Sequence, residues 1–211
     1  MVRDPGQLAG KNAFGDGVGA AGRDPVEDAG KDPGSDAGKE AIVRPCVVLI
    51  GPPGSGKTTV GHSLAHLLGV SFRDTDRAIE VQEGRSVSDI FVDEGEPRFR
   101  ELERAEVASS LVSHSWVLSL GGGAVMDPAN AAALAGHTVV FLDVGIADAA
   151  ARVGFNRSRP LLVVNPRAQW TRMMDIRRPT YERLATLTVL TSGRTPQDVA
   201  AEIAQRVRQT T

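Results

Sequence analysis

The segment CVVLIGPPGSGKT spans residues 46–58 and joins an apolar run to a glycine-rich turn. The run at 46–50 is short, does not alternate with polar residues and is rich in β-branched side chains. This pattern is typical of a parallel strand that is buried on both faces. Residues 51–58 fit the pattern G-x-x-x-x-G-K-[ST], and a helical stretch is predicted over residues 57–68. A turn of this composition between a strand and a helix predicts a phosphate-binding loop.

The residue types of this loop indicate how it would hold a nucleotide. The glycines let the backbone curl so that its N–H groups point inward, and the helix N-terminus adds positive potential. We expect Lys57 to reach the β- and γ-phosphates and the Thr58 hydroxyl to bind Mg²⁺. Switches, motors, transporters and kinases all share this loop, so the reaction must be inferred from other residues.

Strands and helices alternate along the rest of the chain. Further strands are predicted just before Asp74 and at residues 116–120, 138–142 and 187–190. Further helices are predicted at about residues 96–112, 128–135, 146–153, 167–184 and 197–208. Such repeated strand–helix units predict a three-layer α/β/α domain around a mainly parallel sheet.

The N-terminal residues differ from the others in composition. Residues 1–40 contain nine of the 23 glycines, eight Asp or Glu and five Lys or Arg, with hardly any large apolar residue. Such a segment cannot bury enough apolar area to offset the loss of backbone entropy. We therefore predict a disordered acidic tail at residues 1–41 and one globular domain at residues 42–211.

Charge and composition exclude several classes of function. The 211 residues have a net charge of −2 and only nine aromatic side chains, which argues against a nucleic-acid surface. No run approaches the ~20 apolar residues of a membrane span, and no apolar secretory signal begins the chain. The single cysteine, Cys46, excludes an intrachain disulfide. We expect a cytoplasmic protein that binds a small molecule, without a nucleic-acid or membrane partner.

Two carboxylates, Asp74 and Asp76, follow the second predicted strand. Ligands of open α/β sheets gather at the carboxyl ends of the strands, so these side chains should face the phosphates. One could hold Mg²⁺ through water while the other accepts the proton of an attacking hydroxyl. The alternative is that Asp76 only caps a helix beginning at Arg77.

Three other segments combine glycines or charges in ways that suit a binding site. Arg100 and Glu103 are three residues apart on a predicted helix, where the carboxylate can orient the guanidinium or form a solvated pair. Residues 121–123 are three glycines at the end of a strand, which permit either a close backbone approach to a ligand or a tight turn. Residues 154–160 contain Arg157 and Arg159 and could close over phosphates or be a plain basic loop.

These segments together resemble shikimate kinase in identity, order and spacing. The likeness covers about residues 45–208. It is carried by the segments 51–58, 74–76, 99–103, 121–123, 159–162 and 177–181. The resemblance implies a P-loop NTPase fold like that of nucleoside monophosphate kinases, with a five-stranded mainly parallel sheet. It also implies a substrate-binding region at about 74–104 and a lid at about 152–166.

The resemblance further implies transfer of the γ-phosphoryl group of ATP to the 3-hydroxyl of shikimate by a Mg²⁺-dependent monomer, a step of chorismate and aromatic amino acid biosynthesis. Asp76 would be the base, and Lys57 and Arg159 would neutralise the transferred group. Thr58 and Asp74 would hold the metal. The expected nucleotide contacts are Gly54, Ser55, Gly56, Lys57, Thr58, Thr59, Arg152, Arg159, Arg194 and Pro196. The expected shikimate contacts are Asp76, Phe91, Phe99, Arg100, Glu103, Gly121, Gly122, Gly123 and Arg177.

Two alternatives remain at this point. Another small-molecule kinase with the same loop, such as a gluconate kinase-like enzyme, would share the fold. A nucleotide-dependent switch whose tail recruits a partner would bind nucleotide without turning over shikimate. Two converging arginines suit a carboxylate, which disfavours a neutral sugar as the acceptor. Trp116 and Trp170 are predicted to be packing residues.

Overall fold

The computed structural model describes residues 47–113, 115–153 and 165–210. The chain divides between Lys39 and Glu40 into two units, and all described residues belong to the second unit. The tail expected at residues 1–41 lies outside the described residues. Residues 154–164 of the expected lid also lie outside them. Both expectations therefore stay predictions.

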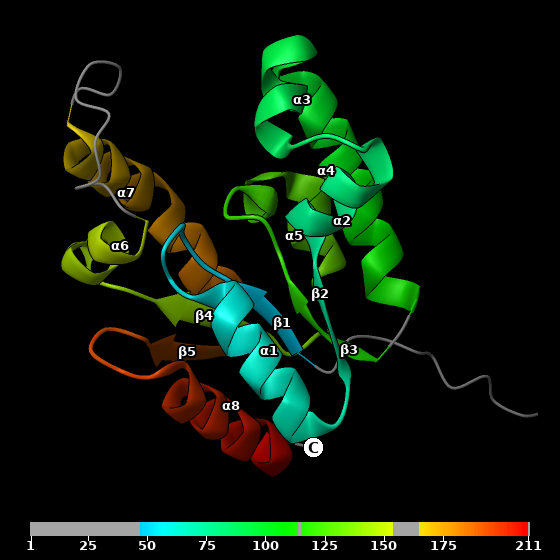
Figure 1. The fold of residues 1–211 in the computed structure, drawn as a ribbon. Coiled ribbons are helices and arrows are strands. Elements are labelled where there is room, and N and C mark those ends of the chain that lie inside the picture. Colours follow the sequence, from blue (N-terminus) through cyan, green and yellow to red (C-terminus); the bar gives the residue numbers. More distant parts are fainter. Residues whose placement is uncertain (1–46, 114, 154–164, 211) are drawn as a thin grey trace, which may run out of the picture. The chain divides into compact units, whose positions relative to one another are not determined.

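The second unit is built on a five-stranded sheet. Its strands are β1 (Val47–Ile50), β2 (Ser71–Asp74), β3 (Trp116–Ser119), β4 (Val139–Asp143) and β5 (Leu187–Leu190). Their order is β2-β3-β1-β4-β5, and every pair of neighbouring strands is parallel (Figure 1). The predicted sheet was mainly parallel, and the described one is wholly parallel. β1 lies in its centre with all four side chains buried, as its unalternating apolar sequence predicts.

Helices cover both faces of the sheet and form three layers with it. They are α1 (Lys57–Leu68), α2 (Thr75–Glu83), α3 (Val87–Asp93), α4 (Gly95–Ser113), α5 (Pro128–Ala133), α6 (Ile146–Val153), α7 (Pro166–Leu184) and α8 (Pro196–Thr210), with a 3₁₀ helix η1 at Ala124–Met126. Side chains alternate across β1: Val47 and Leu49 pack with α1 and α8, whereas Val48 and Ile50 pack with α4 and α7. This alternation divides the core into two hydrophobic clusters.

The region between β2 and α4 was predicted least well. α2 begins at Thr75 and its N-cap is Asp74, whose side chain accepts hydrogen bonds from the backbone N–H groups of Asp76 and Arg77. The alternative that Asp76 caps a helix beginning at Arg77 is therefore wrong. α3 was not predicted at all, although Ser86 and Asp89 form a capping box at its start. A small cluster of Ile79, Ile90 and Phe99 joins α2, α3 and α4.

The parallel sheet brings the ends of its strands to one edge. The loop after β1, Asp74 at the end of β2 and the three glycines after β3 all follow the carboxyl ends of adjacent strands. Ligands of open α/β sheets bind at this edge. Within the described ranges, no helix is both long enough and apolar enough to cross a membrane.

Candidate active site

The phosphate-binding loop runs from Gly51 to the start of α1. Gly54 and Gly56 have φ values of +82° and +90°, a region that favours glycine. A Cβ atom at Gly54 would lie 2.9 Å from the backbone of Ala149, so α6 also requires glycine there. Arg152 of α6 donates to the carbonyl oxygen of Gly54 at 3.2 Å and to the Thr191 hydroxyl at 3.1 Å. It thereby ties the loop to the turn after β5.

Lys57 closes the loop from inside. Its Nζ donates to the carbonyl oxygens of Gly51 at 2.9 Å and Pro52 at 3.2 Å. Burial lowers the pKa of Lys57 to about 8, and the nearby carboxylates of Asp74 and Asp76 oppose that shift. The side chain that the loop pattern singles out is therefore held where phosphate oxygens would approach the backbone N–H groups.

Two cavities adjoin this loop. One of about 460 Å³ is lined by the loop together with Asp74, Asp76 and Gly122. The other, of about 220 Å³, lies between the loop and the start of α8, where Arg194 and Pro196 line it. Gly56, Thr59 and Arg152 line both cavities. The arrangement can therefore accommodate a chain of phosphates in the first cavity and an adjoining base in the second.

Thr58 and Asp74 form an oxygen pair beside the loop. The Thr58 hydroxyl donates to Oδ2 of Asp74 at 3.2 Å, while Oδ1 caps α2. A hydroxyl and a carboxylate are hard ligands of the kind that Mg²⁺ takes up together with phosphates and water. The described residues contain no cluster of three or more His, Cys, Asp or Glu side chains that could hold a metal by themselves. A Mg²⁺ ion that shares phosphate oxygens does not need one, so the pair fits the metal.

Asp76 lies at the start of α2 with a free carboxylate oxygen. Within the described part of the chain, its buried Oδ1 has no hydrogen-bond partner. Burial is the main cause that raises the pKa of Asp76 to about 6; the charges of Asp74 and Glu103 add to the shift, and Lys57 opposes it. A Cβ atom at Gly121 would lie 2.4 Å from this Oδ1. The carboxylate thus rests against the first of the three glycines, and the Asp76 side chain also lines the cavity of about 460 Å³.

Arg100 approaches the same glycines from α4. Its guanidinium forms ion pairs with Glu103 at 2.6 Å and Glu96 at 2.9 Å, so the expected pairing of Arg100 with Glu103 is present. Glu103 is almost fully buried; burial raises its pKa, and the hydrogen bond from Arg100 opposes that shift. A Cβ atom at Gly123 would lie 3.0 Å from both terminal nitrogens of Arg100. The planar end of Arg100 is therefore fixed beside the third glycine.

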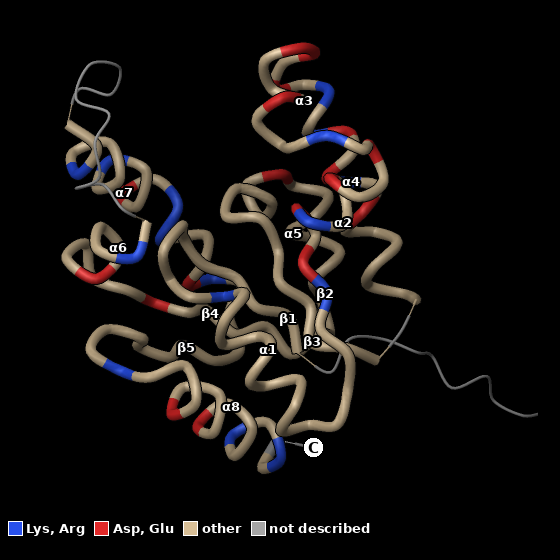
Figure 2. The backbone as a smooth tube through the Cα atoms, in the orientation of Figure 1, with Lys and Arg blue, Asp and Glu red and all other residues tan. Residues whose placement is uncertain are grey.

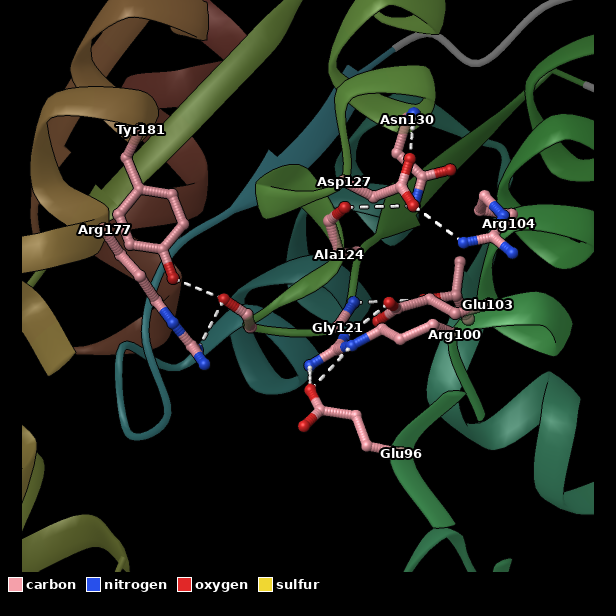
Figure 3. A network of polar contacts seen from close by, with 12 residues as sticks. Glu96, Arg100, Glu103, Arg104, Gly121, Ala124, Asp127, Asn130, Arg177 and Tyr181 are labelled. Carbon is pink, nitrogen blue, oxygen red and sulfur yellow. Dashed lines mark hydrogen bonds and ion pairs between the residues drawn. The ribbon is translucent and has the colours of Figure 1, made fainter. Parts of the chain in front are cut away.

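Arg177 approaches the glycines from the opposite side, on α7. Its Nη1 donates to the carbonyl oxygen of Gly122 at 3.0 Å, and the hydroxyl of Tyr181 donates to the same oxygen. Figure 3 shows Arg177 and Tyr181 on one side of the turn and Arg100 with Glu103 on the other. Among the described residues, Arg177 forms no salt bridge. Its charge opposes the rise in the pKa of the nearby Glu103.

The remaining expected site residues lie in different surroundings. Phe99 is buried between α2 and α3, and the Phe91 ring lies 4.7 Å from it between ring centroids. Arg194 bonds Glu202 at 2.6 Å and lines the smaller cavity. Arg159 and the rest of residues 154–164 lie outside the described residues, so the role expected of Arg159 stays a prediction.

Comparison with known proteins agrees with this geometry. A family model described as shikimate kinase matches residues 53–208. The chain belongs to the shikimate kinase family. It is 58% identical over 160 residues to the shikimate kinase of Salinispora arenicola (strain CNS-205), which is 76% of this chain and 96% of that protein. The structure of shikimate kinase from Acinetobacter baumannii in complex with shikimate has a TM-score of 0.72 and 34% identity, and covers 80% of this chain and 95% of that one.

The fold of this chain is also similar to that of one gluconokinase structure. The structure of a gluconokinase from Sinorhizobium meliloti 1021 has a TM-score of 0.50 and 17% identity, and covers 78% of this chain and 91% of that one. This likeness extends to the three-layer fold alone. The predicted fold class and the resemblance to shikimate kinase are both confirmed.

Three contacts of the site were missed by sequence reasoning. The buried Thr75 hydroxyl accepts a hydrogen bond from the backbone N–H of Gly121 at 3.1 Å. Trp170 packs in the core as predicted, but its Nε1 also donates to the carbonyl oxygen of Pro53 at 3.2 Å. Tyr181 holds Gly122 from α7. A signal for Tyr181 was available, because it lies four residues after Arg177 and hence on the same helix face.

The charged residues around the site are mostly paired with opposite charges. Figure 2 shows basic and acidic residues interspersed over α2, α3 and α4. Arg73 is bound by Glu106 at 2.7 Å, and Arg104 by Asp127 at 2.9 Å. Asp127 also caps α5, the helix that follows the glycine turn and η1. This pairing stabilises the surroundings of the turn and contrasts with Arg177.

Proposed function

We propose that the chain transfers the γ-phosphoryl group of ATP to the 3-hydroxyl of shikimate and releases ADP and shikimate 3-phosphate. The observation that carries the proposal is the placement of Asp76 between the phosphate-binding loop and a glycine turn flanked by two arginines. Membership in the shikimate kinase family supports both substrates. The reaction belongs to the biosynthesis of chorismate and aromatic amino acids.

Asp76 serves as the proton acceptor in this proposal. Its carboxylate, which lines the cavity beside the phosphate-binding loop, takes the proton of the 3-hydroxyl as the oxygen of that hydroxyl forms its bond to the γ-phosphorus. The bond from the γ-phosphorus to the bridging oxygen breaks, and its electron pair leaves with ADP. The raised pKa of Asp76 makes its carboxylate a stronger base than an exposed aspartate.

The donor side supplies position and positive charge. Phosphoryl transfer requires little covalent help from the protein, so catalysis depends on orientation and charge stabilisation. Lys57 and the N–H groups of the loop would bind the β- and γ-phosphates, and Arg159 would contact the transferred group. Thr58 and Asp74 would hold Mg²⁺, which supplies further positive charge when it is bound. Arg152, Arg194 and Pro196 would flank the adenine in the smaller cavity.

The acceptor side selects an anionic ring. Arg100 and Arg177 would bind the carboxylate of shikimate, because a planar guanidinium matches a carboxylate with two parallel hydrogen bonds. Glu103 would keep Arg100 oriented, and the turn at Gly121–Gly123 would admit the ring close to the backbone. Gluconate also has a carboxylate, but the likeness to gluconokinase extends to the fold alone. Shikimate is therefore the acceptor that the comparisons support.

A coupled assay of ADP release tests the proposal. The full chain is incubated with ATP and Mg²⁺, and shikimate, gluconate or a nucleoside monophosphate is added in parallel. We expect turnover with shikimate alone and its loss when a chelator removes Mg²⁺. Turnover with gluconate or a nucleotide but not with shikimate would refute the proposal. Nucleotide binding without turnover of any acceptor would instead favour the nucleotide-dependent switch.

We also expect a monomer in the cytoplasm. The acceptor and donor sides are both formed by residues of one chain, so the proposed chemistry does not require a second copy. Light scattering at working concentrations gives the mass of the particle in solution. A dimer mass that persists on dilution would contradict the expectation without affecting the proposed reaction.

A further inference from the structure

Helix α7 contacts both sides of the site. Near its start, Nε1 of Trp170 donates to the carbonyl oxygen of Pro53 in the phosphate-binding loop at 3.2 Å. Three turns later, the hydroxyl of Tyr181 donates to the carbonyl oxygen of Gly122 in the glycine turn. The Cα atoms of the two residues are about 16 Å apart along the axis at 1.5 Å per residue. One helix thus bonds a backbone carbonyl on the donor side and another on the acceptor side.

The Tyr181 hydroxyl is held by the core. Its side chain is fully buried, and its ring stacks on Phe141 of β4 with 5.1 Å between the ring centroids. Burial raises the pKa of Tyr181, and Arg177 opposes the shift, so the phenol stays protonated and remains a donor. Its acceptor also receives the hydrogen bond of Arg177. Tyr181 therefore fixes the carbonyl on which the position of Arg177 depends.

Trp170 occupies the matching position on the donor side. Its ring is buried in the cluster that also contains Met174 and Tyr181. The two carbonyls that α7 holds belong to segments in mutual contact: a Cβ atom at Gly122 would lie 3.2 Å from the ring of Pro53 and 3.5 Å from the carbonyl oxygen of Gly51. The two carbonyls therefore belong to adjacent segments, one on the donor side and one on the acceptor side.

We propose that Tyr181 and Trp170 are positioning residues, of which Tyr181 fixes the glycine turn that binds the acceptor and Trp170 fixes the loop that binds ATP. The proposal rests on the proposed function, since it assigns each side chain to one of the two substrates. It requires substitution of Tyr181 to weaken shikimate binding and substitution of Trp170 to weaken ATP binding. A role in general stability would not separate the substrates in this way.

The test compares single substitutions in the full chain. Tyr181→Phe removes one hydroxyl and keeps the ring. We expect the KM for shikimate to rise about threefold to tenfold, the range for the loss of one hydrogen bond, with the KM for ATP and kcat within about twofold. Trp170→Phe removes the indole donor, and we expect the KM for ATP to rise by a similar factor while the KM for shikimate stays within about twofold.

A hydroxyl elsewhere on the same helix provides the matched control. Thr171 is exposed, and its hydroxyl donates only to the carbonyl oxygen of Arg167 within α7 at 3.0 Å. Thr171→Val should therefore leave all three kinetic constants unchanged. The proposal would be overturned if each variant changed the KM for shikimate and the KM for ATP by the same factor. It would also be overturned if neither variant changed either KM. Absence of shikimate turnover by the unaltered chain would instead refute the proposed function.

A second measurement keeps the test decisive if a variant fails to fold. Tyr181 is the only tyrosine of the chain, so growth on 3-fluorotyrosine labels this position alone. We expect saturating shikimate to shift the fluorine resonance, and ATP alone to shift it less. Calorimetry on the same sample shows whether shikimate binds. If shikimate binds but does not shift the resonance, the assignment of Tyr181 is overturned.

Discussion

The donor and acceptor sides of the site are built in different ways. The phosphate-binding loop is one continuous segment, 51–58, whose backbone groups and single Lys57 face one cavity. The acceptor side gathers Asp76 from α2, Arg100 from α4 and Arg177 from α7 around the glycine turn after β3. Its members come from four segments and meet only because the parallel sheet brings their elements to one edge.

This difference determines how each side responds to change. The donor side depends on backbone conformation, so its properties belong to the loop and to the helix that follows it. The acceptor side depends on side chains whose orientation is set by neighbours such as Glu103 and Tyr181. Substitutions on the donor side should therefore affect phosphate binding and transfer, whereas those on the acceptor side should separate binding of the ring from the proton transfer.

The largest effect is expected for the base. Asp76→Asn removes the proton acceptor and keeps the shape, so kcat should fall about 10³-fold with a much smaller change in the KM for shikimate. Steady-state kinetics on the purified variant measure both constants. Asp175→Asn, which changes an exposed carboxylate of α7, is the control and should behave as the unaltered chain. Near-normal kcat in Asp76→Asn would show that another group accepts the proton.

On the donor side, Lys57→Met should lower kcat about 10²-fold, because the charge on the transferred group loses one preorganised cation. Shikimate binding measured by calorimetry should persist, since the acceptor side does not include Lys57. If binding of shikimate were lost as well, the two sides would not be separable as we describe them.

The turn at Gly121 gives a graded test of the acceptor side. A methyl group at Gly121 would lie 2.4 Å from Asp76 Oδ1, whereas one at Gly123 would lie 3.0 Å from the two terminal nitrogens of Arg100. Gly121→Ala should therefore displace the base and lower kcat about 30-fold to 100-fold. Gly123→Ala should mainly raise the KM for shikimate, by about fivefold. Steady-state kinetics of the two variants side by side measure this difference, and the reverse order would contradict the geometry.

Arg100 tests the recognition of the carboxylate. Arg100→Lys keeps the charge but loses the planar fork, so we expect the KM for shikimate to rise about tenfold with little change in kcat or in the KM for ATP. Arg98→Lys changes an exposed arginine of the same helix that pairs with Glu94 and Glu101, and should leave the constants unchanged. Equal effects of both substitutions would indicate a general property of α4 rather than contact with substrate.

The smallest effect is expected when the N-terminal residues, which belong to neither the donor side nor the acceptor side, are removed. A chain that begins at residue 41 should keep kcat and both KM values within about twofold, because the site residues all lie between 51 and 196. The match to the relative from Salinispora arenicola covers 96% of that protein with 76% of this chain, so part of this chain matches nearly the whole of that protein. A loss of more than about tenfold, or ~1.4 kcal/mol, would show that the N-terminal residues reach the site.

The sequence predicted most of the fold because its signals are local. Apolar runs and helical periodicity placed β5 and α6 at their observed residues and most other elements within two residues. The exception is the region of α2 and α3. Their apolar residues are few, and the Asp74 side chain could be assigned as a cap only once its geometry was known. Short helices that pack mainly on each other leave a weak signal.

The candidate site was predictable in its members but not in its supports. Residue types with distinct chemistry, such as Arg100 or the three glycines, can be recognised from pattern and resemblance. Contacts to backbone carbonyls carry no such pattern, because any side chain with an N–H or O–H group can make them. Trp170 and Tyr181 were therefore first recognised as supports from the distances in the fold.

The position of Lys57 has a practical consequence for covalent labelling. It is the only lysine after Lys39, and burial lowers its pKa to about 8, so a larger share of its amine is unprotonated at neutral pH than for an exposed lysine. An adenosine derivative with an amine-reactive group in place of the terminal phosphate would meet a single lysine at the site. Lys11, Lys31 and Lys39 would report background reaction in the same peptide digest.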